Sequence, residues 1–225
     1  MKKDDWLYRL YHYSSYFNYI IWLFEVNMLF LLMNLPFAVL IFILDIRLGT
    51  LPILYLSSVT LVPSTYAVIR TLKDVTTEPK VMKNFFIHLK IGYKRLLKLS
   101  LVLLFFLWIM VGNIFITAQL PRLQVLFWLN ILFLLVLITF TINFLIVMAN
   151  WKQTIKETAI LTIKLAIVKS IRSNLNFLIL IGTFILLKLF PIYLLMFGAS
   201  VAILLCMINF KPVIDFVNQE IEEAA

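Results

Sequence analysis

The sequence predicts an all-α, polytopic membrane protein with about six transmembrane helices. Of its 225 residues, 63% are hydrophobic, and the mean hydropathy is +1.02. Soluble domains are only about half apolar, so we expect most of this chain to lie in lipid. Two basic stretches, Arg70–Lys98 and residues 150–174, interrupt the apolar runs. They are expected to form basic amphipathic cytoplasmic segments between spans two and three and between spans four and five.

The chain is interpreted as one integral membrane domain, residues 1–225. The spans are identified by comparing each apolar run with the ~20 helical residues needed to cross the hydrocarbon core. They are predicted at residues 17–44, 51–69, 97–117, 125–148, 175–189 and 191–210.

The first span is longer than a crossing needs. Asn34 and Pro36 supply a break, because proline removes a backbone donor and clashes with the preceding turn. Glu25 lies in the same span, and burying an acid costs about 3 kcal/mol on insertion scales. Apolar neighbours return roughly 0.3 to 0.6 kcal/mol each, so insertion is still favourable.

The second span contains Pro63, followed by Ser64 and Thr65. Their hydroxyl groups can satisfy the backbone carbonyl that proline leaves without a donor. We therefore expect a second broken helix at this point.

The first basic stretch has apolar residues at spacings of three and four, with lysines largely on the other side. This pattern predicts a helix lying flat at the lipid headgroups. His12 and His88 are expected at the lipid interface. The candidates for contact with anionic headgroups or with a partner protein are Lys83, Lys90, Lys94 and Arg95.

The last two spans are expected to form a helical hairpin that reverses near Lys188 and Pro191. The tail from Lys211 ends in acidic residues and is expected to form a separate, short exposed helix. Cys206 lies within an apolar run, so we expect it to serve packing.

The lysine and arginine distribution sets the orientation. With six spans, seventeen of the 20 basic residues fall on the side of the termini, and only Arg47, Arg122 and Lys188 fall on the other. Basic residues near span ends favour the cytoplasm, which predicts cytoplasmic N- and C-termini.

Composition and the absence of certain motifs also exclude several classes of protein. The net charge of +9 is placed between apolar runs, which favours anionic lipid over nucleic acid. A single cysteine and two separated histidines supply no disulfide framework and no metal site. The chain has no Walker A loop, no Gly-x-Ser-x-Gly elbow and no His-Glu-x-x-His helix, so we expect no cofactor, no catalytic residue and no enzyme activity.

Several short motifs carry a family resemblance. They are Leu7-Tyr8-Arg9, Asn27 within a run ending Leu35-Pro36, Pro63 with Ala67 and Arg70, and Phe85-Phe86 with Lys90, Tyr93 and Lys94. In this, the chain resembles the YesL-like family of bacterial integral membrane proteins of unknown function. The resemblance implies a multi-pass protein of the bacterial cell membrane with a role alongside carbohydrate uptake. Components of carbohydrate ABC transporters are then the partners to test.

Polar residues within the spans are the candidate site. An acid in a membrane is a functional hypothesis by default and is expected to face the bundle interior, although a protonated, hydrogen-bonded Glu25 is the alternative. The broken helices at Pro36 and Pro63 either surround a substrate site or are plain kinks. The asparagines either line a path or form interhelical hydrogen bonds worth about 0.6 kcal/mol each. The candidates for a substrate path are Glu25, Asn27, Asn34, Asn130 and Asn143.

Two functions follow from these observations. The first is a component of, or accessory to, small-solute transport, with carbohydrate as the solute class. The second is a membrane scaffold that docks other membrane proteins through its basic cytoplasmic segments.

Overall fold

The computed structural model describes residues 4–75, 80–151 and 153–223, and every regular element in them is helical. The all-α class is therefore confirmed. The elements are α1 (Asp4–Met33), α2 (Leu35–Ile43), η1 (Leu48–Thr50), α3 (Leu51–Ser58), α4 (Leu61–Asp74), α5 (Val81–Lys90), α6 (Tyr93–Ala118), η2 (Pro121–Leu123), α7 (Gln124–Asn150), α8 (Ile155–Val168), α9 (Ser170–Leu189) and α10 (Pro191–Glu223). Lys2, Lys3 and Lys152, together with the side chains of Arg9, His12 and Lys188, lie outside the described part.

Four helical segments are long and apolar enough to cross a membrane: Leu48–Asp74, Tyr93–Ala118, Pro121–Asn150 and Leu195–Gln219. Two bent pairs pass the same test only when each is taken together. They are Phe17–Met33 with Leu35–Ile43, bent by 68°, and Ile155–Val168 with Ser170–Thr183, bent by 98°. By length and composition, the described chain thus holds four to six segments able to span a membrane.

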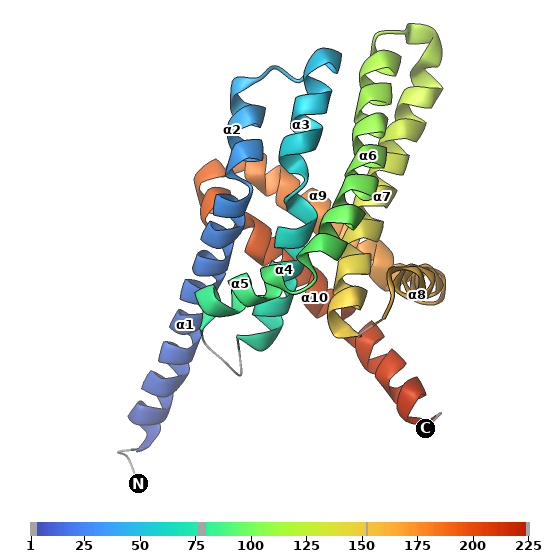
Figure 1. Ribbon diagram of the computed structural model, residues 1–225. Helices are drawn as coiled ribbons and strands as arrows, with labels where there is room; N and C mark the ends of the chain where they lie inside the picture. Colours follow the sequence, from blue (N-terminus) through green and yellow to red (C-terminus); the bar gives the residue numbers. More distant parts are fainter. Residues whose placement is uncertain (1–3, 76–79, 152, 224–225) are drawn as a thin grey trace.

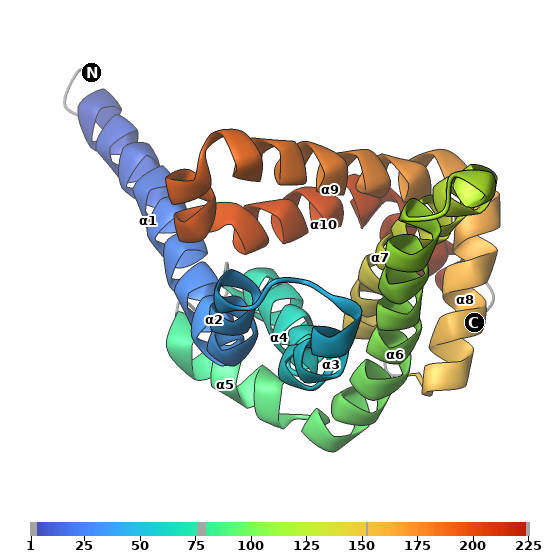
Figure 2. The same cartoon turned by 90° about the horizontal axis from the view of Figure 1, so that it is seen from above.

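The helices have two distinct ends (Figure 1). The α2–α3 and α6–α7 hairpins lie at one end of the molecule. The start of α1 and the C-terminal ends of α4, α7 and α10 lie toward the other. Seen from above, α4 lies between α1 and the α6–α7 pair, with α10 beside it (Figure 2). This central helix contacts α1, α5, α6, α7 and α10.

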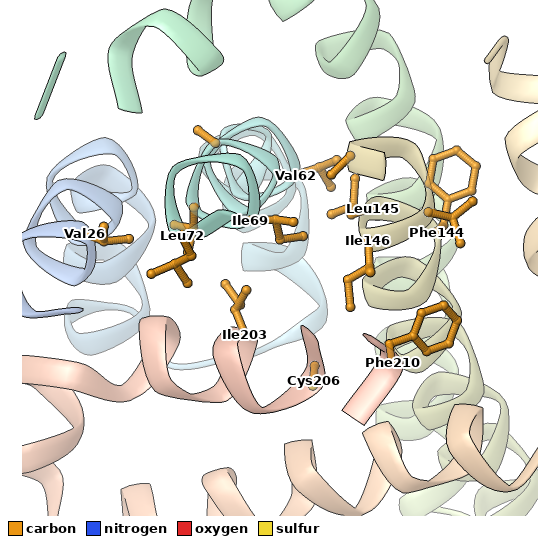
Figure 3. Packing of buried hydrophobic residues seen from close by; sticks show 14 of the residues in the cluster. Val26, Val62, Ile69, Leu72, Phe144, Leu145, Ile146, Ile203, Cys206 and Phe210 are labelled. Atoms are coloured by element: carbon orange, nitrogen blue, oxygen red, sulfur yellow. The ribbon is translucent and has the colours of Figure 1, made fainter. Parts of the chain in front are cut away.

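The core surrounds α4, and Figure 3 shows its centre. Apolar side chains from four helices meet there, which explains why α4 is the most buried of the shorter helices. Cys206 on α10 is fully buried in this cluster, as expected of a packing residue. Other members are Val26, Val62, Ile69, Leu72, Leu145, Ile146, Ile203 and Phe210.

After the end of α4, the first basic stretch continues in two helices instead of one. Gly92, with φ of +76°, turns the chain between α5 and α6, a backbone conformation that glycine adopts without strain. Lys94 and Arg95 therefore lie in the first turn of α6 and not on α5. On α5, Phe85 and Leu89 are buried against the bundle.

The prediction that His88 faces lipid was wrong. His88 is only 8% exposed, and its Nε2 lies 2.7 Å from Oδ2 of Asp74 at the end of α4. This contact joins α5 to α4, the helix that precedes it in the described chain.

The prediction of a separate tail helix was also wrong, because α10 continues through Pro212 to Glu223. Val213 and Val217 extend the buried stripe begun by Phe210 at spacings of three and four, and this packing carries the helix past the proline. The expected hairpin between the last two spans is present, with Phe190 between α9 and α10.

Candidate functional site

Asn34 connects the break between α1 and α2 to the break between α3 and α4. It lies between α1 and α2, and its Nδ2 donates to Phe30 O and to Ser64 Oγ, both at 2.8 Å. Thr60 Oγ1, between α3 and α4, donates to Asn34 Oδ1 at 2.9 Å. Because the amide is buried and bonded on both sides, Asn34 ties the two broken helices together and is not free to contact a solute.

The expected break before Pro63 is present, since α3 ends at Ser58 and α4 begins at Leu61. The carbonyl without a donor belongs to Val59, four residues before the proline. It accepts a hydrogen bond from Ser100 Oγ on α6 at 2.6 Å. The hydroxyl therefore comes from another helix, while that of Ser64 donates to Thr60 O at 2.7 Å.

Asn27 is inserted into the backbone ladder of α10. Its Nδ2 donates to Leu195 O at 2.6 Å, and its Oδ1 accepts from the N–H groups of Ala199 at 3.0 Å and Ser200 at 3.3 Å. A side chain placed between such groups opens the helix locally. Asn27 is 1% exposed, so it is a buried interhelical bridge, as the alternative interpretation expected.

Glu25 does not face the interior. Its side chain is exposed and borders an open hollow with Lys80, Met82 and Lys83. The reason is helical geometry, because the inward face of α1 is set by Val26 and Asn27 and one further residue rotates the side chain by about 100°. We therefore remove Glu25 from the candidate path.

Asn130 and Asn143 lie on the same helix but do not share a cavity. They are thirteen residues apart, or about 20 Å at helical rise. Asn130 is 7% exposed, whereas Asn143 is 3% exposed and accepts a hydrogen bond from Asn176 on α9 at 2.6 Å. The predicted set of polar residues thus does not form one continuous path.

Of the predicted asparagines, Asn143 alone lines one of the cavities found in the described part of the chain. This cavity, of about 450 Å³, lies in the elbow between α8 and α9 and against α7. We call it the elbow cavity. It is lined by Leu132, Val136, Thr139, Phe140, Asn143, Thr162, Ala166, Ser173, Asn174, Phe177 and Leu178.

The elbow cavity contains one unsatisfied hydroxyl. Thr139 Oγ1 donates to Leu135 O at 2.9 Å, and Thr162 Oγ1 donates to Thr158 O at 2.7 Å. Ser173 is 5% exposed, yet its Oγ has no partner within the described residues. Buried polar groups are normally hydrogen-bonded, so this unpaired Oγ beside the cavity is a candidate contact for a polar ligand.

A row of amides holds the wall of the elbow cavity. Asn176 Nδ2 on α9 donates to Asn143 Oδ1 at 2.6 Å, and Asn209 Nδ2 on α10 donates to Asn176 Oδ1 at 2.7 Å. The row fixes α7, α9 and α10 relative to one another. Its members recur in three successive apolar runs, and this recurrence is the signal in the sequence that could have pointed to the site.

The electrostatics of the elbow cavity are neutral, since its lining contains no acidic or basic side chain. Hydroxyl and amide groups against apolar walls suit an uncharged polar molecule, and the volume lies within the range of about 300–1,000 Å³ typical of small-molecule sites. No group of His, Cys, Asp or Glu among the described residues could hold a metal ion.

The basic candidates divide into two kinds. Lys83, Lys90 and Lys94 are exposed. Arg95 is half-buried, and its Nη2 donates to Gln153 O at 2.7 Å, in the connection between α7 and α8. The three lysines remain candidates for surface contacts, whereas Arg95 is half-buried and hydrogen-bonded within the fold.

The fold and the elbow cavity thus define a helical protein with several segments able to span a membrane and a neutral, partly open cavity. Comparisons with family models, with curated proteins and with solved structures find no match for the chain. The resemblance to the YesL-like family stays a prediction.

Proposed function

We propose that this chain is a six-span protein of the bacterial cell membrane that takes part in small-solute transport, with both termini in the cytoplasm. The elbow cavity carries the proposal, because it combines a broken helix pair with an unsatisfied buried hydroxyl at Ser173. In transporters, solute sites lie where spanning helices are discontinuous.

The solute class follows from the lining of the elbow cavity. Without a charged side chain, it cannot compensate the desolvation of an ion. The hydroxyl and amide groups of Thr139, Asn143, Thr162 and Ser173 offer hydrogen bonds to hydroxyls, and Phe140 and Phe177 offer apolar surface. A carbohydrate has both characters, which supports the interpretation of carbohydrate uptake.

The test is direct binding and uptake of neutral sugars. Purified protein in nanodiscs is titrated with radiolabelled glucose, maltose and sucrose, and the same sugars are offered to proteoliposomes with and without candidate transport ATPases. Saturable binding of at least one sugar is expected. Ser173→Ala should weaken it by about five- to tenfold, as expected for a lost hydrogen bond of about 1 to 1.5 kcal/mol.

Two matched variants control this test. Thr183→Val removes a hydroxyl that bonds within α9 and lies outside the elbow cavity, and Glu25→Gln removes the exposed acid. Both should bind sugar as the parent does. Absence of binding and uptake for every sugar, or equal loss in Ser173→Ala and Thr183→Val, would contradict the proposal.

A scaffold role is the second candidate, and the exposed lysines of the first basic stretch favour it. Lys83, Lys90 and Lys94 form no salt bridge with another described residue and remain available to a partner, such as a component of a carbohydrate ABC transporter. Reversal of these three charges should abolish co-purification of that partner in mild detergent. Recovery of the parent protein always alone would count against this role.

A further inference from the structure

A second cavity, separate from the elbow cavity, lies at the end of the molecule where α4 and α7 end. It has a volume of about 900 Å³ and is bordered by the end of α4, the start of α6 and the connection from α7 to α8. We call it the arginine cavity. Its principal side chains are Tyr66, Arg70, Arg95, Trp151, Gln153 and Lys156.

Two arginines from different helices, Arg70 on α4 and Arg95 on α6, line the arginine cavity. Arg70 Nη1 donates to Ala149 O and Arg95 Nη2 donates to Gln153 O, each at 2.7 Å. These bonds fix the positions of both guanidinium groups. A guanidinium has five N–H donors, so each keeps donors for a ligand.

Neither arginine forms a salt bridge with a carboxylate among the described residues, although both are half-buried. Partly buried charges are normally paired with an opposite charge. Lys156 lines the same cavity and is exposed. Three cations thus border one cavity.

One acid, Glu157, also borders the arginine cavity. Its Oε2 accepts a hydrogen bond from the backbone N–H of Thr154 at 2.8 Å, so it completes the capping box of α8, whose N-cap is Thr154. Among the described residues of the lining, three cations against one acid give a net charge of +2. Gln153 adds a buried Oε1 that has no hydrogen-bond partner among the described residues.

We propose that the arginine cavity binds a phosphate ester, with the phosphate group between Arg70, Arg95 and Lys156 and a hydroxyl of the ester donating to Gln153. Guanidinium groups match phosphate in geometry and in charge. Basic cavities between spanning helices are known sites for anionic headgroups. The ester is either the headgroup of an anionic phospholipid or a soluble phosphate ester, and the proposal does not depend on the elbow cavity.

The test uses the full-length, delipidated protein in neutral detergent, with binding followed by native mass spectrometry. The probes are phosphatidylglycerol, phosphatidylcholine and glycerol 3-phosphate. Preference for phosphatidylglycerol over phosphatidylcholine identifies the lipid as the source, and binding of glycerol 3-phosphate identifies the soluble ester.

The decisive variant is Lys156→Gln, because this exposed side chain makes no hydrogen bond within the described structure and its loss should not affect folding. It should lower the affinity for the probe about fivefold, as expected for one lysine near an anionic group. Lys164→Gln makes the same charge change at another exposed position of α8, outside the lining of the cavity, and should leave affinity unchanged. Arg95→Lys keeps the charge but loses the planar fork, and should also weaken binding.

Two results would overturn the proposal. The first is that neither phosphatidylglycerol nor glycerol 3-phosphate binds better than phosphatidylcholine. The second is that Lys156→Gln and Lys164→Gln weaken binding equally, which would mean that general surface charge and not the cavity holds the probe.

Discussion

Replacing Ser173 by alanine is expected to stabilise the empty protein, although the residue is polar and buried. Its Oγ has no partner among the described residues, and a buried hydroxyl without a partner costs about 1–3 kcal/mol. Removing it should therefore raise the free energy of unfolding by about 1 kcal/mol, after a small loss of packing. A hydroxyl retained at such a cost is consistent with a ligand that uses it.

Ser100 provides the matched comparison, because the same substitution there should have the opposite effect. Ser100 is fully buried, and its Oγ donates at 2.6 Å to the Val59 carbonyl that Pro63 leaves without a donor. Ser100→Ala should lower the free energy of unfolding by about 1–3 kcal/mol, because that carbonyl is then left unsatisfied.

The single cysteine supplies the assay. Cys206 is fully buried, so a fluorogenic maleimide reacts with it only when the helices separate. On heating in detergent, the midpoint should shift by about 2–4 °C for each kcal/mol in a chain of this length. We expect Ser173→Ala to melt above the parent and Ser100→Ala below it. Equal destabilisation by both substitutions would refute the assignment of Ser173 as an unsatisfied group.

Three further predictions concern the helix contacts and the orientation. Asn27→Leu removes three hydrogen bonds to α10, and at about 0.6 kcal/mol each it should destabilise the protein by about 2 kcal/mol in the same melting assay. A double-mutant cycle of Asn143→Ala and Asn176→Ala should show a coupling of about 0.6–1.7 kcal/mol, whereas additive effects would mean that their contact contributes nothing. In a cysteine-free background, a cysteine at position 122 should react with a membrane-impermeant maleimide added outside intact cells, and one at position 90 should not; the reverse pattern would invert the proposed orientation.

The helix breaks could be predicted from the sequence because proline acts locally. Pro36 and Pro63 each remove a defined backbone donor, and the chain breaks within a turn before each of them. The hairpin before Pro191 follows for the same reason. What proline cannot indicate is the partner of the exposed carbonyl, since Ser100 comes from a helix far away in the sequence.

The direction in which each polar side chain points was harder to predict from the sequence. A membrane helix is apolar on nearly all sides, so its periodicity does not identify the face that packs inward. Glu25 was therefore expected in the interior, where Val26 and Asn27 lie instead. His88 was expected at the lipid because it lies on a predicted interfacial segment, whereas its burial and its contact with Asp74 show its inward position.

The elbow cavity itself had little signal in the sequence. Serine and threonine are common in spanning helices because their hydroxyls can bond within the helix, as Thr139 and Thr162 do. Ser173 differs from them only in lacking such a bond among the described residues, and this difference depends on the bend between α8 and α9.

The most direct test of the account asks whether the elbow cavity can be reached by a solute. In a Cys206→Ala background, Ser173→Cys is exposed to a small methanethiosulfonate reagent in nanodiscs, with and without a saturating concentration of the sugar that binds. We predict that the new thiol reacts while the protein is folded and that the sugar slows this reaction. A thiol that stays unreactive until the protein unfolds, or reacts at the same rate with and without the sugar, would contradict the account.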